Sequence, residues 1–193
     1  MARVGKNALL KGVSGHVGRI LVLKRYQGGT VISNMPSKRP ARKKQKPKEK
    51  ENRERFQDAI IYARASMKDP KTKALYKTGI TPNKNAANRV AIADFLNAPV
   101  VHYIRTFGYK GAIGDTIMIK ATDDFMVTEV EVEIVTPDGK RLEKGQAVRN
   151  ARREHMWRYT ATMKNENVAG TKIKVTVIDR PENRSAAEVV LNF

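Results

Sequence analysis

Residues 116–135 read TIMIKATDDFMVTEVEVEIV, and this stretch decides the fold class of the chain. Apolar side chains recur there at every second position, at Ile117, Ile119 and Ala121 and again at Val130, Val132 and Ile134. A period of two is typical of β-strands that bury one face, and glutamates fill the other face of the second strand. The stretch therefore predicts two half-buried strands joined through an aspartate-containing turn.

More short strands are expected on the C-terminal side, separated by turn sequences. Thr136-Pro137-Asp138-Gly139 is such a turn, because proline fixes φ and glycine accepts the left-handed conformation. Strands are predicted over residues 142–148, 155–163, 171–178 and 186–193. About six or seven strands in about 95 residues are typical of a β-sandwich, and we expect Trp157 to lie between its two sheets.

The N-terminal side predicts a β-hairpin followed by a basic arm. Residues 19–26 and 30–33 are rich in β-branched and apolar side chains, and Gln27-Gly28-Gly29 supplies the turn between them. Residues 37–55, SKRPARKKQKPKEKENRER, form the densest basic run, in which two prolines exclude helix from the first half. We interpret this run as an arm or a linker.

Helices are predicted between the arm and the strands. Phe56, Ala59, Ile60, Ala63 and Met67 form one apolar stripe on a helix expected to end near Asp69-Pro70. A short helical turn is expected over residues 71–77. A further helix is expected to begin at Thr81-Pro82 and to stop before Pro99. Together these elements predict an α+β protein, with a hairpin, arm and helical module over residues 1–97 and a β-sandwich over residues 98–193.

The charge of the chain is concentrated at its N-terminal end. The formal net charge is +19. Residues 1–56 carry 16 Lys+Arg and 3 Asp+Glu, a net of +13, whereas residues 57–97 have a net of +4 and residues 98–193 a net of +2. A strongly cationic part beside a nearly balanced part is typical of a chain in which one half meets a polyanion.

The basic run is the candidate binding site for nucleic acid or another polyanion. Eight cations lie within thirteen residues: Lys38, Arg39, Arg42, Lys43, Lys44, Lys46, Lys48 and Lys50. Each can neutralise a phosphate and release counterions, which gives affinity without sequence specificity. Contact with protein neighbours and a solvated linker are the alternatives. Stacking of bases is conceivable for Tyr26, Phe56, Tyr62 and Tyr76, although core positions are expected for such aromatics, and for Phe56 above all.

Other classes of site have weaker signals. The chain has no cysteine, its three histidines are scattered, and no motif of an enzyme is present, so neither a cofactor nor catalysis is expected. Oxygen ligands for calcium are available in two groups near strand ends: Asp123 and Asp124, and Asp179 with Glu182 and Asn183. Because these residue types also cap turns, we expect turn chemistry and no metal there. Neither a signal peptide nor a membrane-spanning stretch is apparent, which predicts a cytoplasmic or phage-particle protein without a membrane partner.

Two parts of the chain resemble known families. The sequence GDTIMIKATDDFMVTEVEVEIVTPDGKRLEKGQA, followed by MWRYTATM and KIKVTVIDRPEN, resembles a bacterial immunoglobulin-like domain from about Asp115 to the end. The cysteines of antibody-type domains are missing, so the resemblance implies the sandwich architecture alone. The N-terminal half, with SGHVG, Ser-Asn-Met-Pro and Phe-x-x-Ala-x-x-Tyr-Ala, is similar to an uncharacterised family of small bacterial and phage-associated proteins, which implies no activity.

These observations predict a non-enzymatic binding protein. Its basic half is expected to contact nucleic acid or another polyanion, and its immunoglobulin-like half to contact proteins. The alternative is a structural protein of a phage-like particle or other large assembly, whose arm contacts neighbouring subunits. An adhesive surface domain would fit the C-terminal half, but it would require an export signal.

Overall fold

The computed structural model describes residues 2–4, 10, 12–26, 29–36 and 46–192. The chain forms two compact units, Met1–Glu49 and Lys50–Phe193. The helices that the sequence grouped with the hairpin therefore share a compact unit with the strands that follow them. The predicted boundary between two domains at residue 97 concerns which parts of the chain can fold independently, and it stays a prediction.

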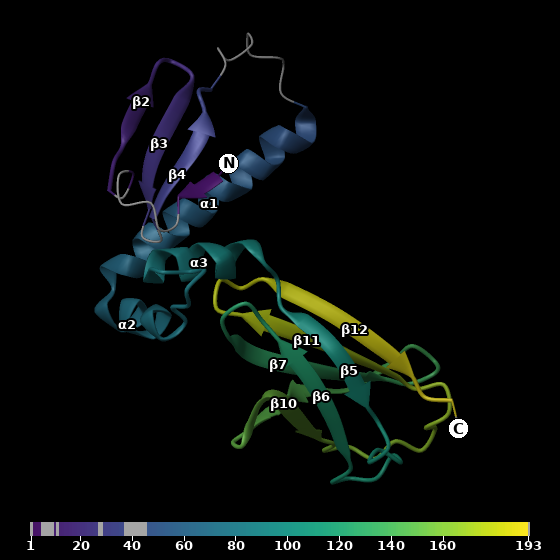
Figure 1. The fold of residues 1–193 in the computed structure, drawn as a ribbon. Coiled ribbons are helices and arrows are strands. Elements are labelled where there is room, and N and C mark those ends of the chain that lie inside the picture. Colours follow the sequence, from purple (N-terminus) through teal and green to yellow (C-terminus); the bar gives the residue numbers. More distant parts are fainter. Residues whose placement is uncertain (1, 5–9, 11, 27–28, 37–45, 193) are drawn as a thin grey trace. The chain divides into compact units, whose positions relative to one another are not determined.

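The first unit contains a four-stranded antiparallel sheet in the order β1-β4-β3-β2 (Figure 1). Its strands are β1 (Ala2–Val4), β2 (Gly15–Val17), β3 (Leu21–Tyr26) and β4 (Gly29–Asn34). The predicted hairpin is present as β3 and β4, which pair from Leu21 with Asn34 to Tyr26 with Gly29. Val22, Leu23 and Thr30 are buried. Because Val22 and Leu23 are neighbours in one strand, their side chains lie on opposite faces of this small sheet.

Three helices begin the second unit. They are α1 (Pro47–Lys68), which starts at the end of the first unit, α2 (Pro70–Thr78) and α3 (Ala87–Leu96). Asp69 ends the first helix and caps the second, because its carboxylate accepts hydrogen bonds from the backbone N–H groups of Lys71 and Thr72. Tyr76, Val90 and Ala91 are fully buried where the helices pack together.

Two expectations about the helical region were wrong. The Thr81 hydroxyl accepts a hydrogen bond from the Lys84 N–H group at 3.2 Å, so Thr81 closes a turn, and the helix begins six residues later at Ala87. Phe56 was expected in the core, yet its side chain is 48% exposed. The apolar stripe on α1 therefore begins after Phe56.

Two four-stranded antiparallel sheets follow, with the orders β5-β6-β10-β9 and β12-β11-β7-β8. The first contains β5 (Val100–Arg105), β6 (Thr116–Thr122), β9 (Val148–Asn150) and β10 (Arg153–Thr160), and the second β7 (Val127–Val135), β8 (Arg141–Gln146), β11 (Lys172–Asp179) and β12 (Arg184–Val190). Both sheets contribute to one hydrophobic core, so they form a β-sandwich, and the chain is a mixed α+β protein (Figure 1).

The core of the sandwich confirms the alternation seen in the sequence. Ile117, Ile119, Val130, Val132 and Ile134 have no exposed surface. Trp157 is only 4% exposed and belongs to the same core cluster, as predicted. Burying the two alternating faces against each other is the main favourable contribution to the stability of this unit.

The number and limits of the strands were predicted less well. Strand β5 was not expected, and the single strand predicted over residues 142–148 is divided into β8 and β9, which belong to different sheets. Strand β5 lies at a sheet edge and pairs only with β6 among the described strands. Its sequence, VVHYIR, does not alternate strictly, and its pairing with β6 shifts register between Val101 and Tyr103.

Gly111 is the glycine whose replacement should destabilise the sandwich most. It has a φ of +91°, and a Cβ atom there would lie 2.4 Å from the carbonyl oxygen of Asn165 and 2.6 Å from Cγ2 of Val168. We expect Gly111→Ala to lower the free energy of unfolding by about 3 kcal/mol or more, because strain adds to a clash with backbone. Gly139→Ala is the control, since Gly139 has a φ of +79° with no described atom within 4 Å. It should cost about 1 kcal/mol. Urea unfolding measures both, and equal losses would contradict the clash.

Candidate functional site

The basic residues predicted to bind polyanions lie only partly within the described structure. Lys38, Arg39, Arg42, Lys43 and Lys44 fall outside the described residues. Lys46, Lys48 and Lys50 lie together at the start of α1, and all three are exposed. Lys50 forms an ion pair with Glu54 at 3.7 Å, which contributes little to stability because both groups are in solvent.

A second candidate site lies where the helices meet the sandwich, and it consists of three aspartates, here called the carboxylate cluster. Asp94 is in the last turn of α3, Asp123 is in the loop between β6 and β7, and Asp179 is the last residue of β11. One carboxylate oxygen of each lies within 4.8 Å of the others. Asp94 and Asp179 are 0% and 2% exposed, and Asp123 is half-buried.

Each aspartate is held by hydrogen bonds to one or both of its oxygens. The Tyr76 hydroxyl donates to Oδ2 of Asp94 at 2.5 Å. The backbone N–H groups of Phe125 and Met126 donate to Oδ2 of Asp123, both at 3.0 Å. The backbone and side-chain N–H groups of Asn183 donate to the two oxygens of Asp179, both at 2.7 Å. Oδ1 of Asp94 and Oδ1 of Asp123 are buried and have no hydrogen-bond partner among the described residues.

Burial dominates the electrostatics of the carboxylate cluster. The pKa of Asp94 is raised to about 8, mainly by burial and also by the neighbouring carboxyl groups of Asp123 and Asp179, whereas the hydrogen bond from Tyr76 opposes the rise. Burial also raises the pKa of Asp179, although the hydrogen bonds from Asn183 oppose the rise. The cluster therefore needs a positive counterpart, either a proton or a cation, when the surrounding solution is near neutral.

The surroundings of the cluster are rigid and polar. The side-chain amide of Asn183 also donates to the backbone carbonyls of Asp94 and Phe95, both at 3.2 Å, so it satisfies the last turn of α3. The hydroxyl groups of Tyr62 and Tyr76 lie 2.7 Å apart and continue the hydrogen-bond chain toward α1. Burial raises the pKa of both tyrosines, so both stay neutral.

Of the five residues considered as calcium ligands from the sequence, the structure brings the carboxylates of Asp123 and Asp179 together, with Asn183 bonded to Asp179. Both aspartates accept the turn hydrogen bonds that were expected of them. Asp124 instead forms an ion pair with Lys84 at 3.1 Å. Asn183 supports Asp179 from within the cluster, and the exposed Glu182 adopts a φ of +70° in the turn.

Asp94 was not predicted from the sequence as a site residue, although its position in the helix pattern could have indicated it. It lies seven residues after Ala87 and three after Ala91, on the face of α3 that these residues bury. A carboxylate on the apolar stripe of a helix is costly unless it is paired or neutralised. Its place in the stripe could therefore have marked it as a functional candidate.

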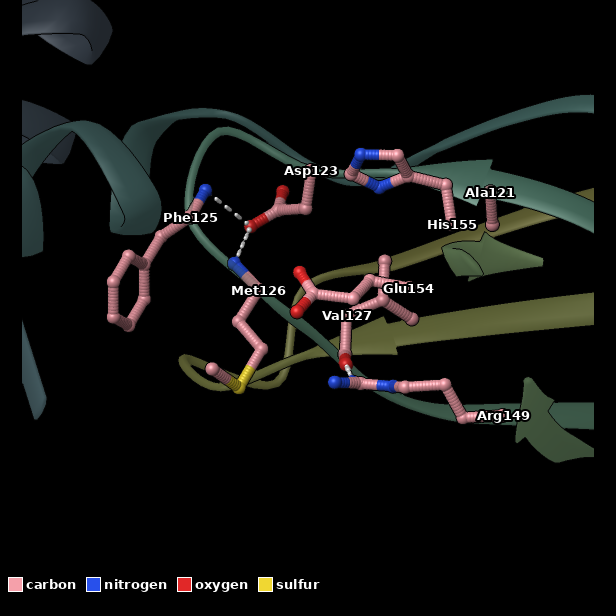
Figure 2. A pocket seen from close by; sticks show the side chains of 8 residues that line it. All are labelled: Ala121, Asp123, Phe125, Met126, Val127, Arg149, Glu154 and His155. Atoms are coloured by element: carbon pink, nitrogen blue, oxygen red, sulfur yellow. Dashed lines mark hydrogen bonds between the residues drawn. The ribbon is translucent and has the colours of Figure 1, made fainter. Parts of the chain in front are cut away.

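A small pocket adjoins the cluster through Asp123 (Figure 2). Its polar lining also includes Arg149, Glu154 and His155, which come from β9 and β10. Figure 2 shows Asp123 beside the His155 ring, with its other side toward Phe125 and Met126. The Arg149 side chain donates to the backbone carbonyl of Val127, and its guanidinium group lies 4.8 Å from the centroid of the Trp157 ring. Asp123 thus links the carboxylate cluster to a polar pocket.

Comparison with known proteins gives only distant structural likenesses. No family model and no curated protein matches the chain. The chain is similar to CopC from Methylosinus trichosporium OB3b, with 13% identity and a TM-score of 0.36, over 47% of this chain and 87% of that one. It is also similar to a DUF4785 family protein from Legionella pneumophila, with 18% identity and a TM-score of 0.33, over 46% of this chain and 27% of that one.

Within the part of the chain that the structure describes, no helix combines the length and the apolar character needed to cross a bilayer.

Proposed function

We propose that the protein is a non-enzymatic binding protein that binds nucleic acid or another polyanion through its first compact unit. The observation that supports this proposal is that most of the excess positive charge lies in one of the two compact units. Met1–Glu49 contains 13 Lys+Arg and a single acidic residue, a net charge of +12, whereas Lys50–Phe193 has a net charge of +7 over three times the length. A small unit with this excess attracts phosphates strongly and without sequence preference.

The sandwich supplies the second half of the proposal. We propose that it is an immunoglobulin-like module and that it contacts other proteins. The two antiparallel sheets with a shared core and a buried tryptophan support this assignment. The proposal places the protein in the cytoplasm or in a phage particle.

A binding titration against salt tests the proposed function. The full chain is titrated into fluorescent duplex DNA, single-stranded DNA and polyphosphate at 50 to 300 mM NaCl. We expect all three to bind at 50 mM, with affinity falling at least a hundredfold by 200 mM, because released counterions drive the association. Binding that is absent at low salt, or that does not weaken as salt rises, would overturn the proposal.

A second candidate function, a structural role in a large assembly, is favoured by a different feature of the first unit. Val13, Val17, Ile20, Tyr26 and Met35 are exposed among the described residues of this unit. Where exposed apolar side chains form a contiguous patch, they mark a surface that contacts protein. In this alternative the basic residues contact acidic parts of neighbouring subunits.

Light scattering with and without nuclease separates the two candidates. A monomer that becomes large only with nucleic acid supports polyanion binding. An oligomer that persists after nuclease treatment supports assembly. Replacing Ile20 and Val17 by serine gives the matched variant, since it should dissolve an apolar assembly and leave the salt-dependent binding of DNA unchanged.

A further inference from the structure

The carboxylate cluster leaves two buried oxygens without partners. Oδ1 of Asp94 belongs to a side chain that is 0% exposed, and Oδ1 of Asp123 is equally hidden from solvent. One carboxylate oxygen of Asp94 lies within 4.8 Å of one carboxylate oxygen of Asp123. Two carboxylate oxygens are acceptors only, so they cannot satisfy each other without a positive group between them.

The spacing of the three carboxylates allows them to bind one cation. The three ligand oxygens lie within 4.8 Å of one another. Calcium binds oxygens at about 2.3–2.6 Å, so ligands around one ion are separated by up to about 5 Å, whereas magnesium requires about 2.0–2.1 Å and a stricter geometry. All the donors are hard carboxylate oxygens, which calcium prefers and which soft metals do not.

The side chains of the site are also held in place. Each carboxylate is fixed by hydrogen bonds to at least one oxygen, from Tyr76, from the backbone at Phe125 and Met126, or from Asn183. Supporting bonds of this kind orient the ligands of a metal before it arrives. Asp123 is half-buried and lines the polar pocket of Figure 2, so the pocket adjoins the cluster at this residue.

We propose that Asp94, Asp123 and Asp179 bind one calcium ion, which joins the last turn of α3 to the ends of β6 and β11. The ion supplies the positive charge that the two unpartnered oxygens lack, and water completes its coordination. Because Asp94 belongs to the helices and the other two ligands belong to the sandwich, binding stabilises the junction between these parts. This inference is independent of the proposed polyanion binding, since its residues lie in the second compact unit.

The test uses the full chain, stripped of metal by a chelator that is then removed. Calorimetry with CaCl2 at pH 7.5 should give a saturable signal for one ion, and saturation should raise Tm by about 5 °C, with a much smaller rise for MgCl2. Terbium is a second probe: excitation of tyrosine should sensitise its emission, because the Tyr76 hydroxyl lies 2.5 Å from Oδ2 of Asp94.

Two ligand variants and one control complete the experiment. Asp94→Asn and Asp179→Asn should each weaken calcium binding at least tenfold and abolish the terbium signal. Asp124→Asn is the matched control, because Asp124 is the neighbour of Asp123 in sequence but pairs with Lys84 outside the cluster. It should bind calcium as the parent does. A folded parent that shows neither heat nor a shift in Tm, or a folded Asp94→Asn variant that binds as well as the parent, would overturn the proposal and indicate that a proton alone fills the cluster.

Discussion

Replacing the eight cations of residues 38–50 by glutamine is expected to weaken binding to duplex DNA by at least about a hundredfold at 50 mM salt. The residues are Lys38, Arg39, Arg42, Lys43, Lys44, Lys46, Lys48 and Lys50. Each contact with a phosphate adds about 0.9 to the slope of log affinity against log salt, so the slope of the variant should be shallower by several units. Fluorescence anisotropy at four salt concentrations measures the affinity and the slope together.

A control variant that loses the same number of positive charges elsewhere shows whether the position of the cations matters in addition to the total net charge. Eight exposed cations of the sandwich and its loops are replaced by glutamine in the control: Lys110, Lys140, Arg141, Arg152, Arg153, Arg158, Lys172 and Lys174. If the first unit binds the polyanion, the affinity of this control variant for duplex DNA should fall less than about tenfold, because only long-range electrostatic attraction is reduced. Equal losses in the two variants would mean that net charge alone drives the binding and that no localised site exists.

The sandwich was predictable because its signal is local. Alternation such as that of Val130, Val132 and Ile134 reflects one buried face within a single strand, and all three residues are fully buried. Strand β5 gave no such signal, because a register shift between Val101 and Tyr103 interrupts its alternation. The start of α3 was misplaced because Thr81 satisfies a turn in the same way that it would cap a helix.

The carboxylate cluster was predictable only in part, because its members are far apart in the sequence. Asp123 and Asp179 stood out as turn residues at strand ends, and they do accept turn hydrogen bonds. That these two lie beside Asp94 depends on how α3 packs against the end of the sandwich, which no local pattern encodes. Burial of the Asp94 carboxylate was visible only as one acidic residue on an apolar helix face.

Asp94→Asn should make the cation-free protein more stable in alkaline solution, the reverse of the usual effect of changing a buried residue. The folded pKa of Asp94, about 8, lies above its ordinary value of 3.8. A group with a raised pKa contributes stability that is complete below the unfolded pKa and is lost as the pH rises through the folded pKa. At pH 9, in a chelator, the parent must keep a carboxylate ionised beside Asp123 and Asp179, out of contact with solvent.

Asparagine removes this cost and has the shape to keep the hydrogen bonds. Its amide oxygen can accept from the Tyr76 hydroxyl, as Oδ2 of Asp94 does, and its amide N–H can donate to the unpartnered Oδ1 of Asp123. We expect the variant to exceed the parent by about 1–3 kcal/mol in free energy of unfolding at pH 9. The difference should shrink toward pH 5, where the parent holds a proton on Asp94.

Urea unfolding in a chelator at pH 5, 7 and 9 measures this difference. Asp179, whose pKa is also raised, and Tyr62 and Tyr76 remain in both proteins. Because they interact with Asp94, the comparison measures the charge of Asp94 together with its effect on these neighbours. A variant that is less stable than the parent by the same amount at every pH would mean that ionisation of the Asp94 carboxyl group does not destabilise the folded protein. Adding calcium at pH 9 should reverse the order, since the ion compensates the parent's carboxylates and the variant has lost one of the three ligands.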